Sequence, residues 1–482
     1  METSELPTLD ALQILFGVVA IPVIALGALL SRRFVVFMLG VLLFLSSIGV
    51  ARDWLGLILG SWILPLQQAR NVVFAGLSGL ILVGGLMLIS ATSLRRVSLI
   101  SWLLLAIGAY QGFARIPHEG LQAGLVSIAF AFATIMPVAL ILPTLVRSFS
   151  EWKVYSQIVA IGMSLFVAAC IVQALLDPSR LTTGLQDRFI GVAANPQHVA
   201  VFAAGVMTFA AWRIWGEPVR KGLPFWVALF AGCGVLILLT GSRTGVVMAT
   251  IGTAALGYRR LGRAVLAAPV LALLAFMSLQ VANFLGVDLP LARLSEGGDT
   301  RSIAWSSLLG DFMSSPMIGV GMSDLDKSEN SFLYAAASFG IGMVLLAITL
   351  AIALFVQCIA VMRAAQPYRR LRPIADLVLG FNLAYFFGAN FEGYIMSRNS
   401  AMMLLLMVSA TVGCTLIAVV REVEASADPE LALRWGMDEL YAEFGGEDDG
   451  LDGESDDDAD DDADGMPDEL GDVDARDGYA VV

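Results

Sequence analysis

Long apolar runs recur along the chain and predict helices that cross a membrane. Most of these runs are about 17 to 25 residues long, the length that a helix needs to span the hydrocarbon core of a bilayer. A backbone in hydrocarbon must satisfy its own hydrogen bonds, which a helix does within one segment. The pattern therefore predicts an all-α fold, a polytopic transmembrane helical bundle.

The apolar runs predict about 12 to 13 spans. They cover residues 11–30, 34–50, 72–92, 97–113, 122–146, 154–175, 197–215, 223–240, 245–258, 264–284, 331–357, 374–390 and 401–420. The stretch 54–66 is apolar but short, and we expect an interfacial or re-entrant segment there.

Basic residues gather in alternate connections between the predicted spans. Examples are Arg32 and Arg33, Arg95 and Arg96, and the run from Arg363 to Arg372. By the positive-inside rule these connections are cytoplasmic, so the N-terminus lies outside and the C-terminus inside. The outer connections are then 176–196, 240–245, 285–330 and 391–400, of which 285–330 is the longest.

Charge divides the chain into two parts. The net charge is −13, yet residues 421–482 hold 24 acidic residues and 3 arginines, and the rest of the chain holds 26 basic and 18 acidic residues. Residues 1–420 therefore form the membrane domain, and 421–482 an acidic, mostly disordered cytoplasmic tail. Within the tail, 429–444 predicts a short helix that docks on a partner or lies against the bundle. The four cysteines lie in apolar runs and are predicted to be buried thiols.

Ionisable residues are rare within the spans and gather at the predicted outer surface. There we find Arg188, Arg243, Arg301, Arg398 and Glu392, with Glu329 in the long loop. An arginine offers a planar fork of donors that suits phosphate oxygens, and several together would suit a lipid diphosphate. The alternative is that these side chains are solvated or contact lipid headgroups.

Three of these arginines lie in short motifs. Arg188 begins an Arg-x-x-Gly, followed by Asn-Pro at 195–196 and by His198; Arg243 lies in a Ser-Arg-Thr-Gly at the join of two spans. Arg301 precedes Trp305, and a Pro-x-x-Gly-x-Gly at 316–321 and the pair Glu329 and Asn330 follow. In this order the motifs resemble the O-antigen ligase and O-antigen polymerase family of bacterial envelope glycosyltransferases. The resemblance covers about residues 185–400.

The resemblance implies a reaction at the outer face of the bacterial inner membrane, with the N-terminus periplasmic. A glycan carried on undecaprenyl diphosphate is transferred to a glycan, a lipid A core or a protein, without metal or cofactor. Membrane lipids, a flippase and a chain-length regulator are the expected partners, and nucleic acid is not. By the same resemblance, Arg188 and Arg243 stabilise the leaving diphosphate and Arg301 assists or orders the loop. The remaining predicted substrate-binding residues are Asn330, Glu392, Arg398 and His198.

The sequence departs from the family at Glu329, where family ligases carry a histidine that activates the acceptor. A carboxylate is also able to act as a general base, so Glu329 is the predicted catalytic base. The missing histidine favours a polymerase over a ligase. Two alternatives stay open: a transporter or channel, and a non-catalytic component of an envelope polysaccharide assembly complex.

The long outer loop carries two further features. Residues 300–314 predict an amphipathic helix that buries Ala304, Trp305, Leu308, Leu309 and Phe312, either as a cover for the bundle or as a lid over the site. The acidic residues between 324 and 329 lack the glycine of a calcium loop, so we expect a solvated turn and no metal site.

Overall fold

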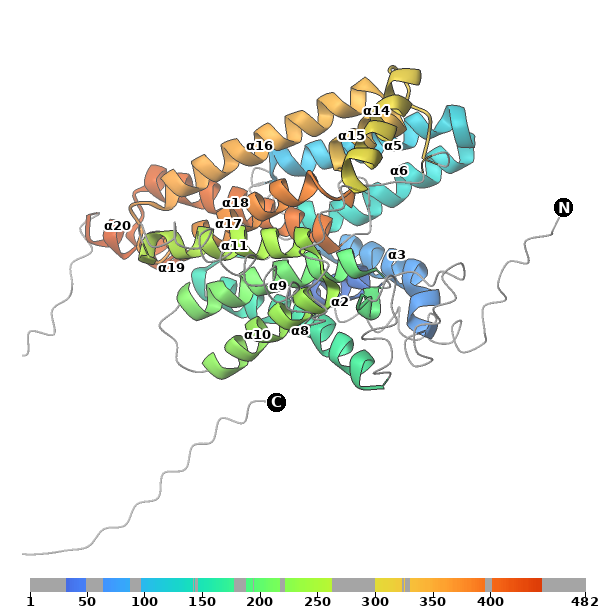
Figure 1. Ribbon diagram of the computed structural model, residues 1–482. Helices are drawn as coiled ribbons and strands as arrows, with labels where there is room; N and C mark the ends of the chain where they lie inside the picture. The colour runs from blue at the N-terminus through green and yellow to red at the C-terminus, as the bar shows by residue number, and fades with distance from the viewer. Residues whose placement is uncertain are drawn as a thin grey trace, which may run out of the picture.

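The computed structural model describes residues 32–48, 64–86, 97–141, 143, 146–176, 188–193, 195–216, 222–261, 300–322, 325, 330–394 and 401–443. In these residues the chain is almost entirely helical and contains no strand. Figure 1 shows a bundle of long helices, with α14 and α15 near one end and α19 and α20 at the other. The predicted spans 11–30 and 264–284 lie outside the described residues.

Eleven long helices and four short ones build the described part of the bundle. The long helices are α2 (Arg32–Ser47), α3 (Leu64–Leu86), α5 (Leu99–Glu119), α6 (Leu121–Met136, continued by the π-helical η2, Pro137–Ile141), α8 (Phe149–Leu176), α9 (Pro196–Gly216), α10 (Leu223–Thr240), α11 (Arg243–Leu261), α16 (Ile341–Ala365), α17 (Arg372–Ala389) and α18 (Ala401–Ser426). The short ones are α14 (Thr300–Ser314), α15 (Ser331–Phe339), α19 (Pro429–Arg434) and α20 (Asp438–Glu443).

Seven of the described helices are long and apolar enough to cross a membrane: α5, α6, α8, α9, α10, α16 and α18. This supports the predicted membrane helical bundle. The helices α2, α11 and α17 coincide with the predicted spans 34–50, 245–258 and 374–390 without being among the seven. Helix α3 only overlaps the predicted span 72–92, because it begins at Leu64 and so takes in the end of the apolar stretch 54–66, of which 54–63 lie outside the described residues.

Close contacts between small residues hold the centre of the bundle together. Helix α9 packs against α10, α11 and α17. Gly245 of α11 lies against Ala200 of α9, and Gly252 approaches Thr208 of α9 and Gly380 of α17. In a membrane, helices associate through such van der Waals packing, because lipid offers no hydrophobic driving force between them.

The predicted span 331–357 is wrong in one respect, because it is two helices. Gly340, with φ 75°, ends α15 and precedes α16. A side chain at this position would overlap the carbonyl of Met317, and the amide of Ile341 donates to the Pro316 carbonyl at 2.9 Å. The break thus depends on contact with a distant segment, which an apolar pattern does not reveal.

The helix predicted at 300–314 is present as α14, but its buried face is narrower than expected. Ala304 and Leu308 are buried, Trp305 and Phe312 are half-buried, and Leu309 is 50% exposed. The prediction for Leu309 was wrong: among the described elements, α14 packs chiefly against α15, which covers Ala304 and Leu308 and leaves Leu309 outside the contact.

The tail segment predicted at 429–444 forms two short helices, α19 and α20, separated by Gly436 with φ 70°. Trp435 and Leu440 are buried, so this segment lies against the bundle. Asp438 of α20 also forms an ion pair of 2.9 Å with Arg370, and both side chains are about half exposed.

The prediction of buried thiols is confirmed for Cys170, Cys233 and Cys358, whereas Cys414 is half-buried. None of the four takes part in a disulfide.

Candidate functional site

The segment that carries Arg188 is fixed to the end of α10. The Phe189 amide donates to the Leu239 carbonyl at 3.2 Å, and Arg188 Nε donates to the Thr240 carbonyl at 2.5 Å. Gly191, with φ 49°, begins a short 3₁₀ turn, and a Cβ there would lie 2.9 Å from the Cys170 sulfur. The Arg-x-x-Gly motif is therefore a half-buried arginine followed by a glycine that the packing requires.

The Asn-Pro motif starts helix α9. Asn195 Oδ1 accepts from the Gln197 amide at 2.8 Å, and Pro196 is the first residue of the helix. This is an N-terminal cap followed by a proline whose missing N–H costs nothing there. His198 lies in the first turn of α9 with its side chain exposed.

The Ser-Arg motif joins α10 to α11. Gly241, with φ 57°, ends α10, and Ser242 caps α11 by accepting from the Gly245 amide at 3.3 Å. Arg243 is the first residue of α11 and its side chain is exposed. Because the N-terminus of a helix carries partial positive charge, its field adds to that of the guanidinium. This corner of the molecule suits an anionic group.

Glu392 connects this corner to two other elements. The Thr244 hydroxyl of α11 donates to Glu392 Oε1 at 3.3 Å, and the Ser331 hydroxyl of α15 donates to the Glu392 carbonyl at 2.5 Å. Glu392 follows the end of α17 and is 7% exposed. The structure thus brings together the Ser-Arg motif, the start of α15 and Glu392, which lie far apart in the sequence.

Asn330 shapes the start of α15. Its Oδ1 accepts from the amides of Phe332 at 2.9 Å and Leu333 at 3.1 Å, and its backbone has φ 76°. The side chain is buried. The structure therefore gives Asn330 a capping role, and substrate binding by Asn330 stays a prediction.

The Pro-x-x-Gly-x-Gly motif packs along the end of α15. The Val320 amide donates to the Ala337 carbonyl at 2.8 Å, and the Gly321 amide to the Ser338 carbonyl at 3.2 Å. Gly319, with φ 71°, lies so close to Ser338 that a Cβ would overlap the backbone. The glycines of the motif thus keep α15 in place, and α15 in turn carries Ser331 to Glu392.

The other predicted site residues are less well defined. Arg301 lies in the first turn of α14, which packs against α15, and its side chain is not among those described. Glu329 and Arg398 lie outside the described residues, as do Asp324 and Asp326 of the predicted acidic turn. Among the residues that the structure describes, no group of three or more His, Cys, Asp or Glu side chains could hold a metal ion.

Sequence reasoning assigned no role to Thr244, Ser331 or Tyr394. Thr244 lies inside the Ser-Arg-Thr-Gly motif and Ser331 directly follows Asn330, but the contacts of their hydroxyls with Glu392 follow from tertiary structure alone. Tyr394 donates to the Tyr385 carbonyl at 2.7 Å. Burial raises the pKa of Tyr394 well above its ordinary value, and Tyr385 and Glu392 raise it further, so the hydroxyl stays protonated.

Neither the models of known protein families nor the curated protein sequences contain a match to this chain.

Proposed function

We propose that this protein is a membrane glycosyltransferase that polymerises or ligates surface polysaccharide from an undecaprenyl diphosphate-linked glycan. The supporting observation is the hydrogen-bonded junction at Glu392. It joins α11, which begins with Arg243, to α15, while Arg188 is bonded to the end of α10 beside them. These are the segments that carry the resemblance to the O-antigen ligase and polymerase family.

In the proposed reaction, an acceptor hydroxyl attacks the anomeric carbon of the donor sugar. The new glycosidic C–O bond forms as the bond from that carbon to the diphosphate oxygen breaks, and the hydroxyl proton passes to a base. Arg188 and Arg243 stabilise the charge that grows on the leaving diphosphate. Glu329 is the proposed base, and Arg301, Arg398 and His198 contact the substrate.

Glu392 and Asn330 have a different proposed role, which is to position the others. Glu392 is buried and accepts a hydroxyl hydrogen bond, so it fixes the start of α11 relative to the start of α15. Asn330, which directly follows Glu329 in the sequence, caps the start of α15. A rigid arrangement of this kind keeps charged groups aligned with a reacting centre.

A buried polar network in the bundle bears on the transporter alternative. Asn382 Nδ2 donates to Gln357 Oε1 at 3.3 Å, the Ser409 hydroxyl donates to Asn382 Oδ1 at 3.0 Å, and Gln357 Nε2 donates to the Ala410 carbonyl at 2.6 Å. The network is uncharged and its amides are paired across α16, α17 and α18. Such networks hold membrane helices together, which favours a scaffold over a transport path.

The test is transfer in proteoliposomes that contain a lipid-linked oligosaccharide and an acceptor. Arg188→Ala and Arg243→Ala should each lower the release of undecaprenyl diphosphate by about 100-fold or more, the usual loss when one donor to a developing oxyanion is removed. Arg421→Ala is the matched control, because Arg421 is an exposed arginine near the end of α18. Full activity in both site variants contradicts the proposal, and an inactive wild-type protein would favour the non-catalytic alternative.

The products and the base are tested in the same assay. A ladder of lengthening lipid-linked glycans indicates a polymerase, and a single addition to lipid A core indicates a ligase. Glu329→Gln should abolish transfer and Glu329→His should retain part of it. Unchanged transfer in Glu329→Gln would remove this residue from the mechanism.

A further inference from the structure

Large apolar side chains are exposed along α14 and the segment that follows it. Leu309, Met313, Met317 and Ile318 are each at least 50% exposed. Exposing apolar surface to water is unfavourable, so a contiguous apolar patch marks contact with a partner, a ligand or a membrane. This patch therefore requires an occupant.

The patch follows one side of α14. Trp305, Leu309 and Met313 are spaced four residues apart, so they lie in one row along the helix, and Trp305 is half-buried. Ser307 is exposed on nearly the opposite side, about 160° around the helix axis from Leu309, and Ile303 is exposed there as well. Helix α14 thus has a stripe buried against α15, with the apolar row on one flank and Ser307 on the other.

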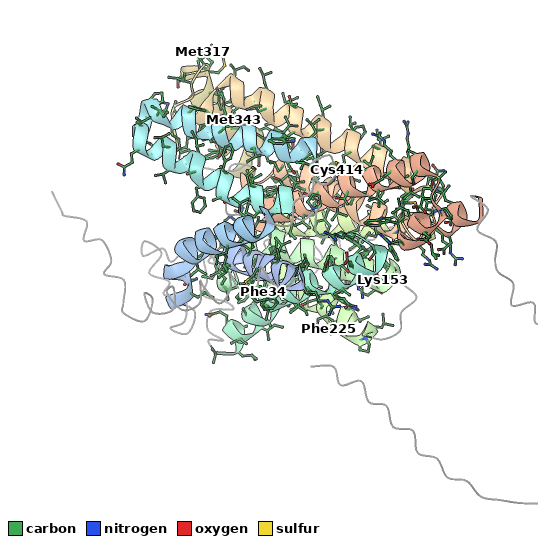
Figure 2. All side chains as sticks on the ribbon, turned by 180° about the vertical axis from the view of Figure 1, so that it is seen from behind. Phe34, Lys153, Phe225, Met317, Met343 and Cys414 are labelled. Carbon is green, nitrogen blue, oxygen red and sulfur yellow. The ribbon has the colours of Figure 1, made fainter. Side chains whose placement is uncertain are left out.

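The apolar row continues onto the start of α16. The amide of Ile341, the first residue of α16, donates to the Pro316 carbonyl at 2.9 Å. A Cβ on Gly340 would overlap the backbone of Met317 and Ile318, so these two residues adjoin the end of α16. Figure 2 shows Met317 at the outside of this end of the bundle.

Helix α16 lies at the periphery of the bundle. It is long and apolar enough to cross a membrane, yet only 33% of its most apolar 18 residues are buried. Its exposed apolar residues recur every three or four positions and form one stripe along the helix: Ile341, Leu345, Ile348, Ile352, Phe355, Val356 and Ile359. In a membrane, lipid covers such a stripe, because acyl chains are as apolar as these side chains.

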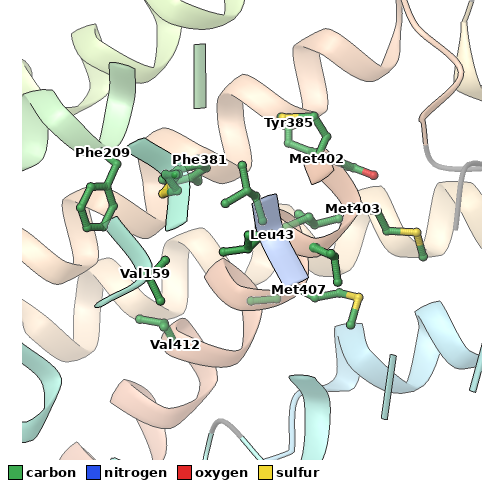
Figure 3. Close-up of a cluster of buried hydrophobic side chains, with 14 of the residues drawn as sticks. Leu43, Val159, Phe209, Phe381, Tyr385, Met402, Met403, Met407 and Val412 are labelled. Atoms are coloured by element: carbon green, nitrogen blue, oxygen red, sulfur yellow. The ribbon is translucent and has the colours of Figure 1, made fainter. Parts of the chain in front are cut away.

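Helix α18 shows the opposite arrangement. Of its most apolar 18 residues 78% are buried, and its Met403 and Met407 belong to the core cluster that also holds Leu43 of α2 (Figure 3). The protein therefore fills its interior with its own side chains, and the stripe of α16 is a true outer surface.

The length of α16 gives the depth of the patch in the membrane. Arg363, in the last turn of α16, is exposed and marks the level at which this helix leaves the hydrocarbon. Residues 340 and 363 are 23 positions apart, or about 34 Å along the axis, whereas the hydrocarbon core is about 30 Å thick. Met317 and Ile318, which adjoin Gly340, therefore lie within about 4 Å of the opposite edge of the hydrocarbon.

We propose that the apolar row of α14, together with Met317 and Ile318, is seated in the lipid of the adjacent leaflet, which is the outer leaflet in the predicted orientation. An amphipathic helix at this level buries its apolar side about 5–10 Å into the boundary between headgroups and acyl chains. Helix α14 is thus a membrane anchor for the loop that carries it. This inference does not depend on the proposed transferase activity.

The experiment measures the surroundings of single introduced cysteines that carry the fluorescent dye bimane. The full-length protein is reconstituted in vesicles of phosphatidylcholine and phosphatidylglycerol. Leu309→Cys and Met317→Cys report on the patch, and Ser307→Cys, on the other side of α14, is the matched control. Labelling of the wild-type protein measures the background from the four native cysteines.

Two quenchers distinguish lipid from water. We expect phospholipid with a nitroxide near the top of its acyl chain to remove most of the fluorescence at positions 309 and 317, and aqueous iodide to remove little. At position 307 the order should be reversed.

Strong quenching by iodide at 309 and 317 overturns the proposal, because the patch would then lie in water. Weak quenching by both agents at these positions also overturns it, because a second copy or a further part of the chain would then cover the patch. If either patch variant fails to fold, the other one gives the same decision.

Discussion

Gly319→Ala should weaken the packing of the Pro-x-x-Gly-x-Gly segment (316–321) against α15. Gly319 has φ 71°, a conformation that costs an L-residue about 1–2 kcal/mol. The added Cβ would lie less than 3.0 Å from the backbone of Ser338 and Phe339, which is unable to yield as a side-chain tip would. Relieving this overlap costs about 1–3 kcal/mol more, so the variant should lose about 2–5 kcal/mol of stability.

The buried cysteines provide the assay. A thiol-reactive dye labels Cys170, Cys233 and Cys358 only after unfolding exposes them, so fluorescence during heating reports the midpoint temperature. Gly319→Ala should lower this midpoint by several degrees. Transfer activity should fall as well, because α15 holds Ser331 against Glu392.

The control is Gly310→Ala, since Gly310 lies within α14 and a Cβ there would contact nothing within 4 Å. Alanine is favoured over glycine inside a helix by about 1 kcal/mol, so its midpoint should be equal or slightly higher. If Gly319→Ala unfolds at the same midpoint temperature as Gly310→Ala, the close packing of 316–321 against α15 is refuted.

Two further substitutions test other contacts. Thr244→Val removes the hydroxyl that donates to the buried Glu392, so it should lower the transfer rate about tenfold, from the loss of about 1.5 kcal/mol. Thr244→Ser keeps the hydroxyl and should retain activity. Equal transfer rates for the two variants would show that this hydrogen bond is dispensable. Gly162→Ala places a Cβ against the Gly40 carbonyl, so α2 and α8 must separate and the midpoint temperature in the dye assay should fall. Gly234→Ala is the control: a Cβ there has open space around it, so the midpoint temperature should be unchanged. Identical midpoints for the two variants would argue against this contact between α2 and α8.

Sequence alone located most of the helices. Apolar length is a local property, and the predicted spans at 154–175, 197–215 and 223–240 coincide closely with α8, α9 and α10. The burial of Cys170, Cys233 and Cys358 was predictable for the same reason, since an apolar run is buried in lipid or protein wherever it packs, whereas Cys414 is half-buried. Charge placed the predicted start of the tail at residue 421, but α18 continues to Ser426, and α19 and α20 lie against the bundle.

Tertiary contact decided the details of the candidate site. The division between α15 and α16 at Gly340 depends on the distant Met317 carbonyl, and the roles of Thr244 and Ser331 depend on Glu392 being brought to both. Residues far apart in the sequence leave no periodic signal when they meet.

The tail segment 429–444 also shows which features the sequence predicts and which ones only tertiary contact decides. Its apolar residues predicted a helix that docks on a partner or lies against the bundle, but only the tertiary structure shows that Trp435 lines the same apolar pocket as Phe149 and Leu371. An apolar face specifies that burial is favourable without specifying the partner, because the hydrophobic effect has no direction. The sequence therefore determined the helices, and the tertiary structure determined which of their ends meet.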